Sequence, residues 1–269
     1  MRDEEAPGPL TPASAPEAPG RRSGEDARGA GGATLRAIEA TGLPAADLLP
    51  VGPRANIPYR LVRMVGVPLL RLFFVFDVTS RQNIPRPRSG NYIVIANHLN
   101  WLDEFALLVL FPVEPRLHFL ADPTMLVTRK FQWWLVRTTG GYVPVIRGKH
   151  GDQALYRHVD RCLELGGAVA IFPEGDYGKA EGELMAFHKG FAHFAIKAHV
   201  PVVPVALSGC KDLWFRKHIK VIVGPAISTA GQDPAALTQQ AYDTIKSMLP
   251  AYSEPPGRKL LRGWLTHLF

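Results

Sequence analysis

Residues 92–103, which read YIVIANHLNWLD, are the clearest guide to the fold of this chain. The first five of these residues form an apolar run and predict a buried strand, because a strand covered on both faces shows no alternation of polar and apolar residues. His98 follows that strand, and Asp103 stands five positions later. On one straight helix the two side chains would diverge by roughly 140°. They meet only if the chain turns between a strand that ends at Asn97 and a helix that starts near Asn100.

A histidine and an aspartate in contact would supply the proton-accepting part of an acyl-transfer site. Histidine has an unperturbed pKa near neutrality, and an aspartate that accepts a hydrogen bond from one ring nitrogen fixes which nitrogen can take a proton. The pattern alone also fits a capped helix start with an incidental histidine. Residues 168–175, AVAIFPEG, add a second signal. There another apolar strand runs into Glu174 and Gly175, and catalytic groups of α/β folds gather at the carboxyl ends of buried strands.

Four blocks of the sequence resemble those of the glycerolipid acyltransferases typified by 1-acyl-glycerol-3-phosphate acyltransferase. They are His98 with Asp103, which match a His-x4-Asp motif, then residues 140–148 (GGYVPVIRG), residues 172–175 (FPEG) and residues 200–206 (VPVVPVA). The resemblance covers roughly residues 56–228. Because four blocks in the expected order are far more specific than one motif, the chain is identified as a member of this family.

The resemblance implies a role for each residue of the pair. His98 is the general base that removes a proton from an acceptor hydroxyl, and Asp103 orients it. The freed oxygen attacks the acyl thioester of acyl-CoA or acyl carrier protein without an acyl-enzyme, and no cofactor or metal is expected. The acceptor implied is of the lysophosphatidic acid type, in phospholipid biosynthesis. Cys162 and Cys210 agree with direct transfer, because neither lies in a motif and both are expected to be small core residues.

The expected substrate-binding residues are Arg147, Glu174, Gly175 and Lys189. The guanidinium of Arg147 presents paired donors that match phosphate oxygens, and the family associates its position with the acceptor phosphate. Glu174 by analogy helps to build the acceptor pocket, although an anion is better suited to bind a hydroxyl or to hold its loop. Gly175 permits a tight turn or a close approach by substrate. Lys189 belongs to a family element of the form Phe-x-Lys-Gly.

One departure from the family pattern concerns the acceptor. After Glu-Gly the family continues with threonine, arginine and serine, whereas residues 176–179 read DYGK. A second phosphate-facing arginine is missing, and Lys179 or Lys189 would replace it by a point charge rather than a bidentate fork. Another lysophospholipid or a glycolipid-type acceptor is therefore the alternative to lysophosphatidic acid. A non-catalytic lipid-binding protein of the same fold is the hypothesis from a different class.

Residues 58–76 predict a helix that lies in a membrane interface. They are apolar except for Arg60, Arg63 and Arg71, which fall within a stripe roughly 80° wide. A spanning helix needs about 20 apolar residues with few charges, and Arg71 interrupts the only candidate segment. A core helix with snorkelling arginines is the alternative. The net charge of +7 suits an anionic lipid surface, and no nucleic-acid-binding motif is present. We expect a peripheral or monotopic protein on the cytoplasmic face of a membrane.

The chain is expected to have four parts. Residues 1–32 form a disordered Pro/Gly/Ala-rich tail without the apolar run of a signal peptide, and residues 33–79 form a helical membrane-association segment. Residues 80–250 form the catalytic domain, and residues 251–269 form a basic amphipathic tail, which is either a second membrane contact or a solvated terminus.

In the catalytic domain strands alternate with helices. This alternation predicts an α/β fold with a mostly parallel mixed sheet flanked by helices, preceded by the interfacial helix. Strands are expected at residues 92–96, 117–121, 142–146, 168–172, 202–207 and 220–223. Helices are expected near residues 102–110, 130–137, 152–165, 191–198 and 234–248.

Overall fold

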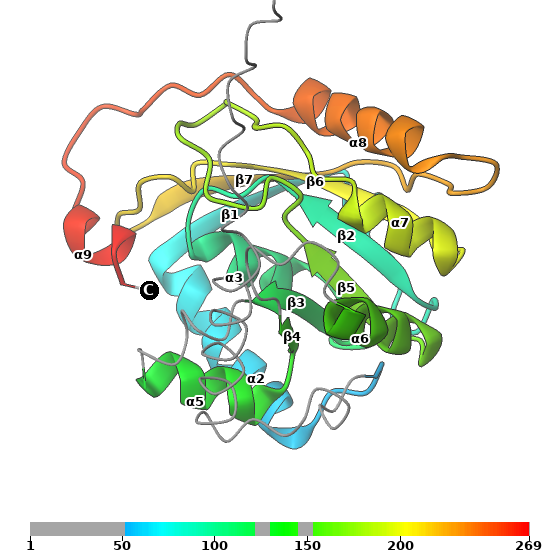
Figure 1. The fold of residues 1–269 in the computed structure, drawn as a ribbon. Coiled ribbons are helices and arrows are strands. Elements are labelled where there is room, and N and C mark those ends of the chain that lie inside the picture. The colour runs from blue at the N-terminus through cyan, green and yellow to red at the C-terminus, as the bar shows by residue number, and fades with distance from the viewer. Residues whose placement is uncertain (1–51, 122–129, 145–152, 269) are drawn as a thin grey trace, which may run out of the picture. The chain divides into compact units, whose positions relative to one another are not determined.

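A computed structural model describes residues 52–121, 130–144 and 153–268 (Figure 1). The core of the described part is a seven-stranded sheet with the order β1-β7-β6-β2-β5-β3-β4. Neighbouring strands are parallel except β6 and β7, which are antiparallel. The predicted α/β fold with a mostly parallel mixed sheet is therefore confirmed. The strands are β1 (Phe74–Thr79), β2 (Tyr92–Ala96), β3 (Leu117–Ala121), β4 (Tyr142–Pro144), β5 (Ala168–Ile171), β6 (Val202–Ser208) and β7 (Lys217–Val223).

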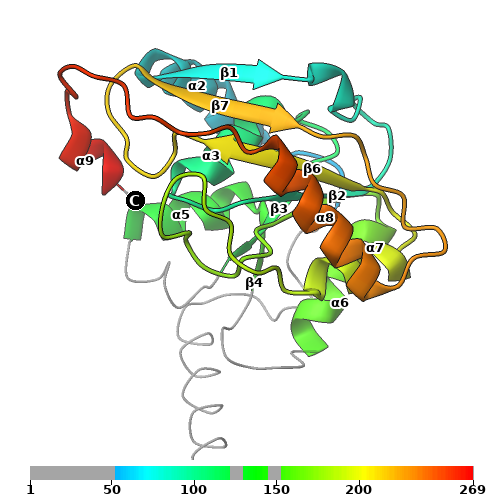
Figure 2. The ribbon, with the colours of Figure 1, turned by 90° about the horizontal axis from the view of Figure 1, so that it is seen from above.

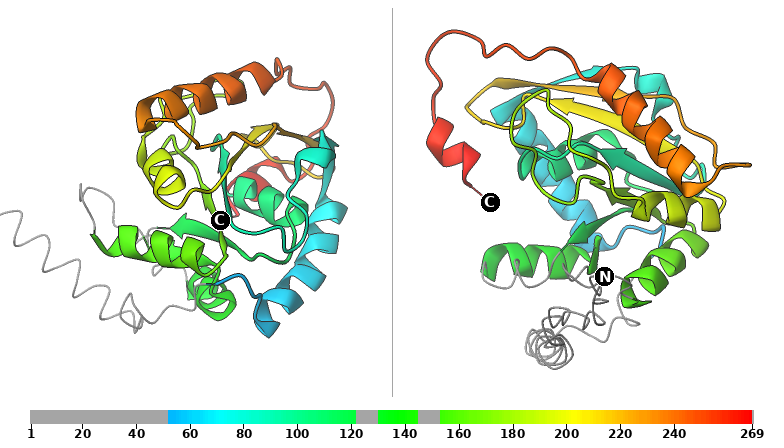
Figure 3. Two further views of the ribbon diagram at one scale, coloured as in Figure 1. Left: turned by 90° about the vertical axis from the view of Figure 1, so that its right-hand side faces the viewer. Right: turned by 45° about the horizontal axis from the view of Figure 1, so that its top comes forward.

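Helices cover both faces of the sheet (Figures 1 and 2). One face carries α6 (Gln153–Glu164), α7 (Gly190–Lys197) and α8 (Pro234–Met248). The other carries α2 (Ile57–Phe73) and α3 (Leu102–Leu110), with α5 (Lys130–Thr139) beside α2. A short 3-10 helix, η2 (Arg81–Asn83), follows β1. Residues 249–261 contain no helix or strand and lead to α9 (Arg262–Thr266), which lies away from α8 (Figure 3).

The central strand β2 is buried on both faces because every one of its side chains is apolar. Tyr92, Val94 and Ala96 join the cluster that includes α3 and the buried Leu265 of α9. Ile93 and Ile95 point to the opposite face and join the cluster under α6, α7 and α8. This double burial fixes the end of β2, and therefore the start of the following loop, in the middle of the sheet.

Two helix starts follow simple capping rules. The Asn56 side chain accepts a hydrogen bond of 2.9 Å from the N–H of Tyr59 at the start of α2. The Asp233 carboxylate accepts hydrogen bonds from the N–H groups of Ala235 and Ala236 at the start of α8. Each cap satisfies amide groups that have no partner inside the helix.

The strands and helices expected between residues 92 and 248 are present where the structure describes them. The strand expected at residues 142–146 is described as far as Pro144, because residues 145–152 lie outside the described ranges. Residues 1–51 lie outside them too, and include the expected disordered tail. The division of the chain into four parts stays a prediction.

The expected helix over residues 58–76 ends early. It stops at Phe73, and residues 74–79 form the edge strand β1, which pairs in parallel with β7. The reason is tertiary: Phe74 is 1% exposed and packs in the core, where a strand partner is available. A run rich in Phe and Val suits a strand as well as an apolar helix, so the sequence pattern did not separate the two.

Candidate active site

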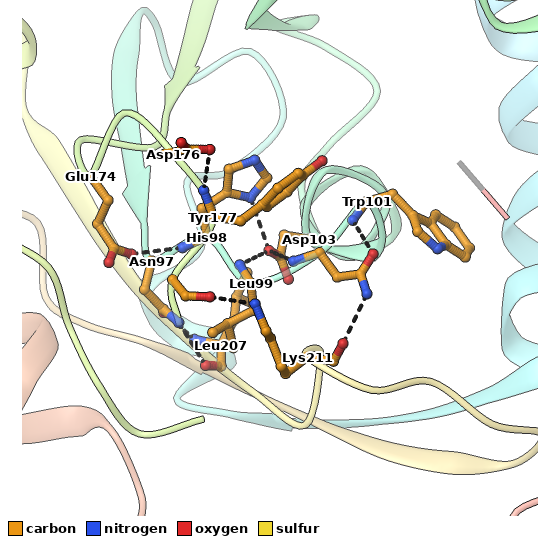
Figure 4. Close-up of polar contacts among 12 residues, drawn as sticks. Asn97, His98, Leu99, Trp101, Asp103, Glu174, Asp176, Tyr177, Leu207 and Lys211 are labelled. Atoms are coloured by element: carbon orange, nitrogen blue, oxygen red, sulfur yellow. Dashed lines mark hydrogen bonds and ion pairs between the residues drawn. The ribbon is translucent and has the colours of Figure 1, made fainter. Parts of the chain in front are cut away.

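The structure brings His98 and Asp103 together (Figure 4). His98 lies in the loop after β2, and Asp103 lies in the first turn of α3. The distance between His98 Nδ1 and Asp103 Oδ2 is 2.9 Å. The side chain of Asp103 is fully buried, whereas that of His98 retains 11% of its exposure. The contact expected from the turn between strand and helix is therefore present.

Asp103 also holds the loop that carries the histidine. Its Oδ2 accepts hydrogen bonds from the backbone N–H of Leu99 and, at 2.8 Å, from that of Asn100. A carboxylate in the first turn of α3 lies where the unsatisfied amides of the helix favour negative charge. One carboxylate oxygen thus fixes both the loop and the imidazole.

This arrangement determines which ring nitrogen of His98 is available. A carboxylate acceptor at Nδ1 favours the tautomer in which Nδ1 carries the proton. Nε2 of the neutral ring is then the acceptor. The geometry is that of a general base held by an orienting carboxylate.

Two aromatic rings enclose the imidazole of His98. The Phe172 ring stacks on it with centroids 3.9 Å apart and an interplanar angle of 13°. The Tyr177 ring lies at 4.3 Å with an angle of 46° (Figure 4). Phe172 belongs to the FPEG block, whereas Tyr177 stands in the segment that departs from the family pattern. The aromatic contact of Tyr177 was not expected from the sequence.

Glu174 joins two loops through its carboxylate. Oε1 accepts a hydrogen bond of 2.8 Å from the backbone N–H of His98, and Oε2 accepts one of 2.8 Å from that of Met185. Burial raises the pKa of the Glu174 carboxyl, against the opposing effect of these two amide hydrogen bonds. Both oxygens accept hydrogen bonds from backbone amides, so Glu174 holds the loop of His98 and the loop of Met185 together.

Asn97 ties the loop to the neighbouring strand β6. Its Nδ2 donates a hydrogen bond of 2.9 Å to the carbonyl of Leu207, and its Oδ1 accepts one of 2.7 Å from the N–H of Leu207. The reciprocal pair is buried. Sequence reasoning missed this anchor, although an asparagine directly after a buried strand was a visible signal.

The segment after Glu174 is tied to the residues that follow β6. The N–H of Gly178 donates to the carbonyl of His98 at 2.6 Å, and Lys211 Nζ donates to the carbonyl of Gly178. The Glu181 carboxylate accepts hydrogen bonds from the N–H groups of Gly209 at 2.9 Å and Lys211 at 2.7 Å. Both amides lie about 30 residues after Glu181 in the sequence, so only the folded structure shows that Glu181 holds this segment.

The other expected substrate residues lie in different settings. Arg147 is outside the described residues, so its place relative to His98 stays a prediction. Lys189 is exposed at the start of α7. The amide hydrogen bonds from Ala236 and Ala235 lower the pKa of Asp233, and the charge of Lys189 adds a smaller effect in the same direction. Lys179 is exposed as well. Gly175 has a φ of +74°, and a Cβ there would lie 3.0 Å from the His188 ring, so both its backbone and its surroundings favour glycine.

The two cysteines are buried, as expected of small core residues. Burial raises the pKa of the Cys162 thiol to about 12 and that of Cys210 well above its usual value. Within the described ranges, no cluster of His, Cys, Asp and Glu has the arrangement of a metal site.

The site lies at the carboxyl ends of β2, β5 and β6, inside the region that matches a known family. The model of the family described as Acyltransferase matches residues 75–208, about half of the chain. The chain belongs to the acyltransferase family. The matched region begins in β1 and ends with β6, so it includes His98, Asp103 and Glu174.

Individual acyltransferases show how distant the relationship is. The 1-acyl-sn-glycerol-3-phosphate acyltransferase alpha of Mus musculus is 25% identical over 183 residues, which are 62% of this chain and 61% of that protein. The 1-acyl-sn-glycerol-3-phosphate acyltransferase of Pseudomonas aeruginosa is 27% identical over 170 residues, 61% of this chain and 63% of that protein. The chain thus spans less than two thirds of the length of these curated relatives.

A solved structure shares the fold. The crystal structure of the 1-acyl-sn-glycerophosphate acyltransferase from Thermotoga maritima has a TM-score of 0.59, covering 84% of this chain and 90% of that one. The sequence identity is 20%. At that identity the likeness concerns the fold alone.

Proposed function

We propose that this acyltransferase moves a fatty acyl group from acyl-CoA or acyl carrier protein to the hydroxyl of a lysophosphatidic acid-type acceptor. The observation that carries the proposal is the 2.9 Å contact between His98 Nδ1 and Asp103 Oδ2, which leaves Nε2 as a proton acceptor. A binding protein has no chemical need for a base held by a carboxylate. The geometry therefore favours turnover over lipid binding alone.

The proposed step is a direct transfer. His98 Nε2 takes the proton of the acceptor hydroxyl while its oxygen attacks the thioester carbonyl carbon. The tetrahedral intermediate collapses, the carbon–sulfur bond breaks, and the proton on His98 passes to the departing thiolate. The products are an ester and a free thiol. The buried, protonated Cys162 and Cys210 support a route without an acyl-enzyme, because a thiolate is the nucleophilic form of cysteine.

Glu174 contributes to this step by position. Its hydrogen bond to the N–H of His98 fixes the backbone from which the base extends, and its hydrogen bond to Met185 fixes the facing loop. We propose that Arg147 binds the acceptor phosphate and that Gly175 and Lys189 border the acceptor.

A different hydroxyl lipid is the second candidate acceptor, and Tyr177 favours it. This residue stands where the family carries an arginine, and its ring lies 4.3 Å from the imidazole of His98. An aromatic ring at this place offers an apolar face and a phenol instead of a guanidinium fork. A lysophospholipid with another head group or a glycolipid-type acceptor fits such a surface.

The proposed acceptor is a membrane lipid, and α2 presents a surface for a membrane. Two of its three arginines bond to neighbouring parts of the protein: Arg60 pairs with Glu114, and Arg63 Nη2 donates to the carbonyl of Phe111 at 3.0 Å. Its apolar side chains are left exposed, among them Leu61 and Met64. In the described parts of the chain no helix has the length and apolar character needed to cross a bilayer. We propose that the protein lies on the cytoplasmic face of an anionic membrane as a peripheral or monotopic enzyme.

The experiment that tests the function offers purified protein an acyl-CoA or acyl carrier protein thioester and a panel of hydroxyl lipids. Release of free thiol is compared between wild type and His98→Ala, and loss of the base is expected to cost about 10²- to 10⁴-fold in rate. Asp103→Asn should reduce the rate too, because it removes the carboxylate that selects the tautomer. The proposal is contradicted if none of the acceptors leads to consumption of the thioester, or if His98→Ala remains fully active.

Arg147→Ala separates the two acceptor classes. If Arg147 binds a phosphate, this variant loses activity with lysophosphatidic acid and keeps it with an uncharged acceptor. An equal loss with both acceptors contradicts a phosphate-binding role.

A further inference from the structure

The exposed apolar side chains are concentrated on three elements of the fold. Within the described residues, all but three of the large apolar side chains that are exposed belong to α2, to α5 or to residues 260–268. The three exceptions are Tyr156, Leu165 and Tyr177. Residues 260–268, which include α9, are far from α2 and α5 in the sequence, so only folding brings them together.

These elements surround one apolar groove of about 570 Å³. On the α9 side it is lined by Trp264, Leu265 and Leu268, and on the α5 side by Phe131 and Trp134. The remaining lining residues come mainly from α2 and α3. Leu265 is buried and anchors α9 to the core, while Trp264 and Leu268 remain exposed at the rim. An exposed apolar surface of this extent marks an interaction site.

Hydrogen bonds hold α9 against the loop of the candidate active site. Trp101 Nε1 donates to the carbonyl of Leu265 at 2.9 Å, and Asn100 Nδ2 donates to that of Thr266 at 3.3 Å. Asn100 and Trp101 lie between His98 and Asp103 in the sequence. Whatever binds the exposed side of α9 is therefore placed next to the loop that carries the proposed base.

Two cations, Arg71 and Arg216, line a second hollow that adjoins this groove at Phe74. Arg71 and Arg216 are exposed, and Arg216 Nη1 donates to the carbonyl of Arg71 at 3.2 Å. The N–H of Phe215 donates to the carbonyl of Leu260 at 2.9 Å, so these arginines adjoin residues 260–268. In the part of the chain that the structure describes, neither arginine forms an ion pair with a carboxylate.

We propose that residues 260–268 form, together with α2 and α5, one docking surface for a bilayer that contains anionic phospholipid. This proposal rests on the proposed function, in which the acceptor is a membrane lipid. Tryptophan and phenylalanine at the rim suit the boundary between headgroups and acyl chains, and unpaired arginines suit lipid phosphates. A second copy of the chain fits less well, because a two-fold contact places the same patch against itself and gives Arg71 and Arg216 no anion.

Vesicle binding of the purified full chain tests the proposal. The test variant is Trp264→Ser/Leu268→Ser, whose wild-type side chains are 55% and 38% exposed. The control is Tyr156→Ser/Leu165→Ser, whose side chains are 40% and 50% exposed on and just after α6. In Figures 1 and 2, α6 and α9 lie on opposite sides of the sheet. Binding is measured by flotation with phosphatidylcholine vesicles that contain phosphatidylglycerol.

Wild type and the control variant should bind alike, and the α9 variant should bind about tenfold more weakly, since it loses two apolar side chains from the contact. Replacing phosphatidylglycerol by phosphatidylcholine, or raising the salt to 1 M, should weaken wild-type binding because the arginines lose their counter-charge or are screened. Circular dichroism and a thermal melt verify folding of each variant. If the double variant does not fold, Trp264→Gln, a single change at a half-exposed side chain, replaces it.

Vesicle binding of the α9 variant equal to wild type overturns the proposal. Light scattering that shows a wild-type dimer and a monomeric α9 variant, with unchanged vesicle binding, also overturns it in favour of self-association. The assay contains no substrate, so it is independent of turnover. If wild type consumes no thioester but loses vesicle binding through the α9 changes, the proposed function fails while the docking surface stands.

Discussion

Glu174 Oε1 accepts a hydrogen bond of 2.8 Å from the backbone N–H of His98, so the carboxylate of one strand end holds the base carried by another. Glu174 follows β5 and His98 follows β2, and the two strands are parallel neighbours in the sheet. The two blocks lie far apart in the sequence. Their contact explains why a carboxylate is useful at this position even when it does not bind substrate: it accepts two amide hydrogens at once.

Glu174→Gln should therefore weaken both the fold and the activity. Glutamine has one acceptor oxygen, so its NH₂ group must face the N–H of either His98 or Met185. We expect a loss of about 1 to 3 kcal/mol in the free energy of unfolding, measured by urea denaturation, with a lower rate of thioester consumption. Glu183→Gln is the control, because Glu183 is exposed in the same loop. Equal effects of the two changes would argue against the bridging role.

Asn97→Ala should destabilise the protein more than Asn83→Ala. Asn97 makes two buried hydrogen bonds with Leu207, whereas Asn83 Nδ2 makes one partly buried hydrogen bond with the carbonyl of Val223. The expected losses in unfolding free energy are about 2 to 4 kcal/mol and about 1 kcal/mol. Chemical denaturation measures both, and the prediction fails if Asn83→Ala is the costlier change.

Tyr177→Arg should move acceptor preference toward phosphate-bearing lipids. It replaces the ring beside His98 with a guanidinium, which presents paired donors to phosphate oxygens. The quantity to measure is the ratio of kcat/KM with lysophosphatidic acid to kcat/KM with an uncharged hydroxyl lipid. We expect about a tenfold rise for Tyr177→Arg, equivalent to about 1.4 kcal/mol, and little change for Tyr177→Phe, which keeps the ring. An unchanged ratio in Tyr177→Arg would show that residue 177 does not influence the preference for the acceptor.

His118 should make the fold sensitive to acid. It is fully buried, and its Nε2 accepts a hydrogen bond of 3.1 Å from Arg116 Nη2. Burial, and next the charge of Arg116, lower the pKa of His118 from 6.5 to about 4. Between these pH values the unfolded chain binds a proton that the folded chain does not, so stability is full above pH 6.5 and falls as the pH drops toward 4.

The expected loss over that window is about 3 kcal/mol. His118→Gln removes the titration and retains an acceptor for Arg116, so its unfolding free energy should vary less with pH. His193→Gln, at an exposed histidine of α7, is the control and should follow wild type. Urea denaturation at several pH values measures the slopes, and identical slopes for wild type and His118→Gln would rule out His118 as the source.

Much of the fold could be predicted because several of its strands and helices carry clear local sequence signals. The run at residues 92–96 is apolar throughout, which is what a strand buried on both faces requires, and β2 has these bounds. The helix at residues 234–248 begins with the cap Asp233 followed by proline, and α8 begins there. In both cases the local sequence and the packed structure favour the same conformation.

The edge strand β1 shows where this agreement ends. Its residues 74–79 continue the apolar run of α2, and nothing in the run itself marks the change from helix to strand at Phe73. β7, which pairs with β1, lies more than a hundred residues later. A strand at the edge of a sheet depends on that partner for its hydrogen bonds, and a one-dimensional pattern contains no information about the partner.

The sequence is enough to locate the strand ends at which His98 and Glu174 lie, and to infer that His98 and Asp103 meet only across a turn. These conclusions depend on local geometry, because helix periodicity and the burial of a short strand are set by neighbouring residues. Four contacts are visible only in the folded protein: Glu174 holds His98, Asn97 holds β6, Tyr177 packs against the imidazole, and α9 lies beside Trp101. Each of these contacts joins segments whose distance in space is set by the order of strands in the sheet, and that order results from packing of the whole chain.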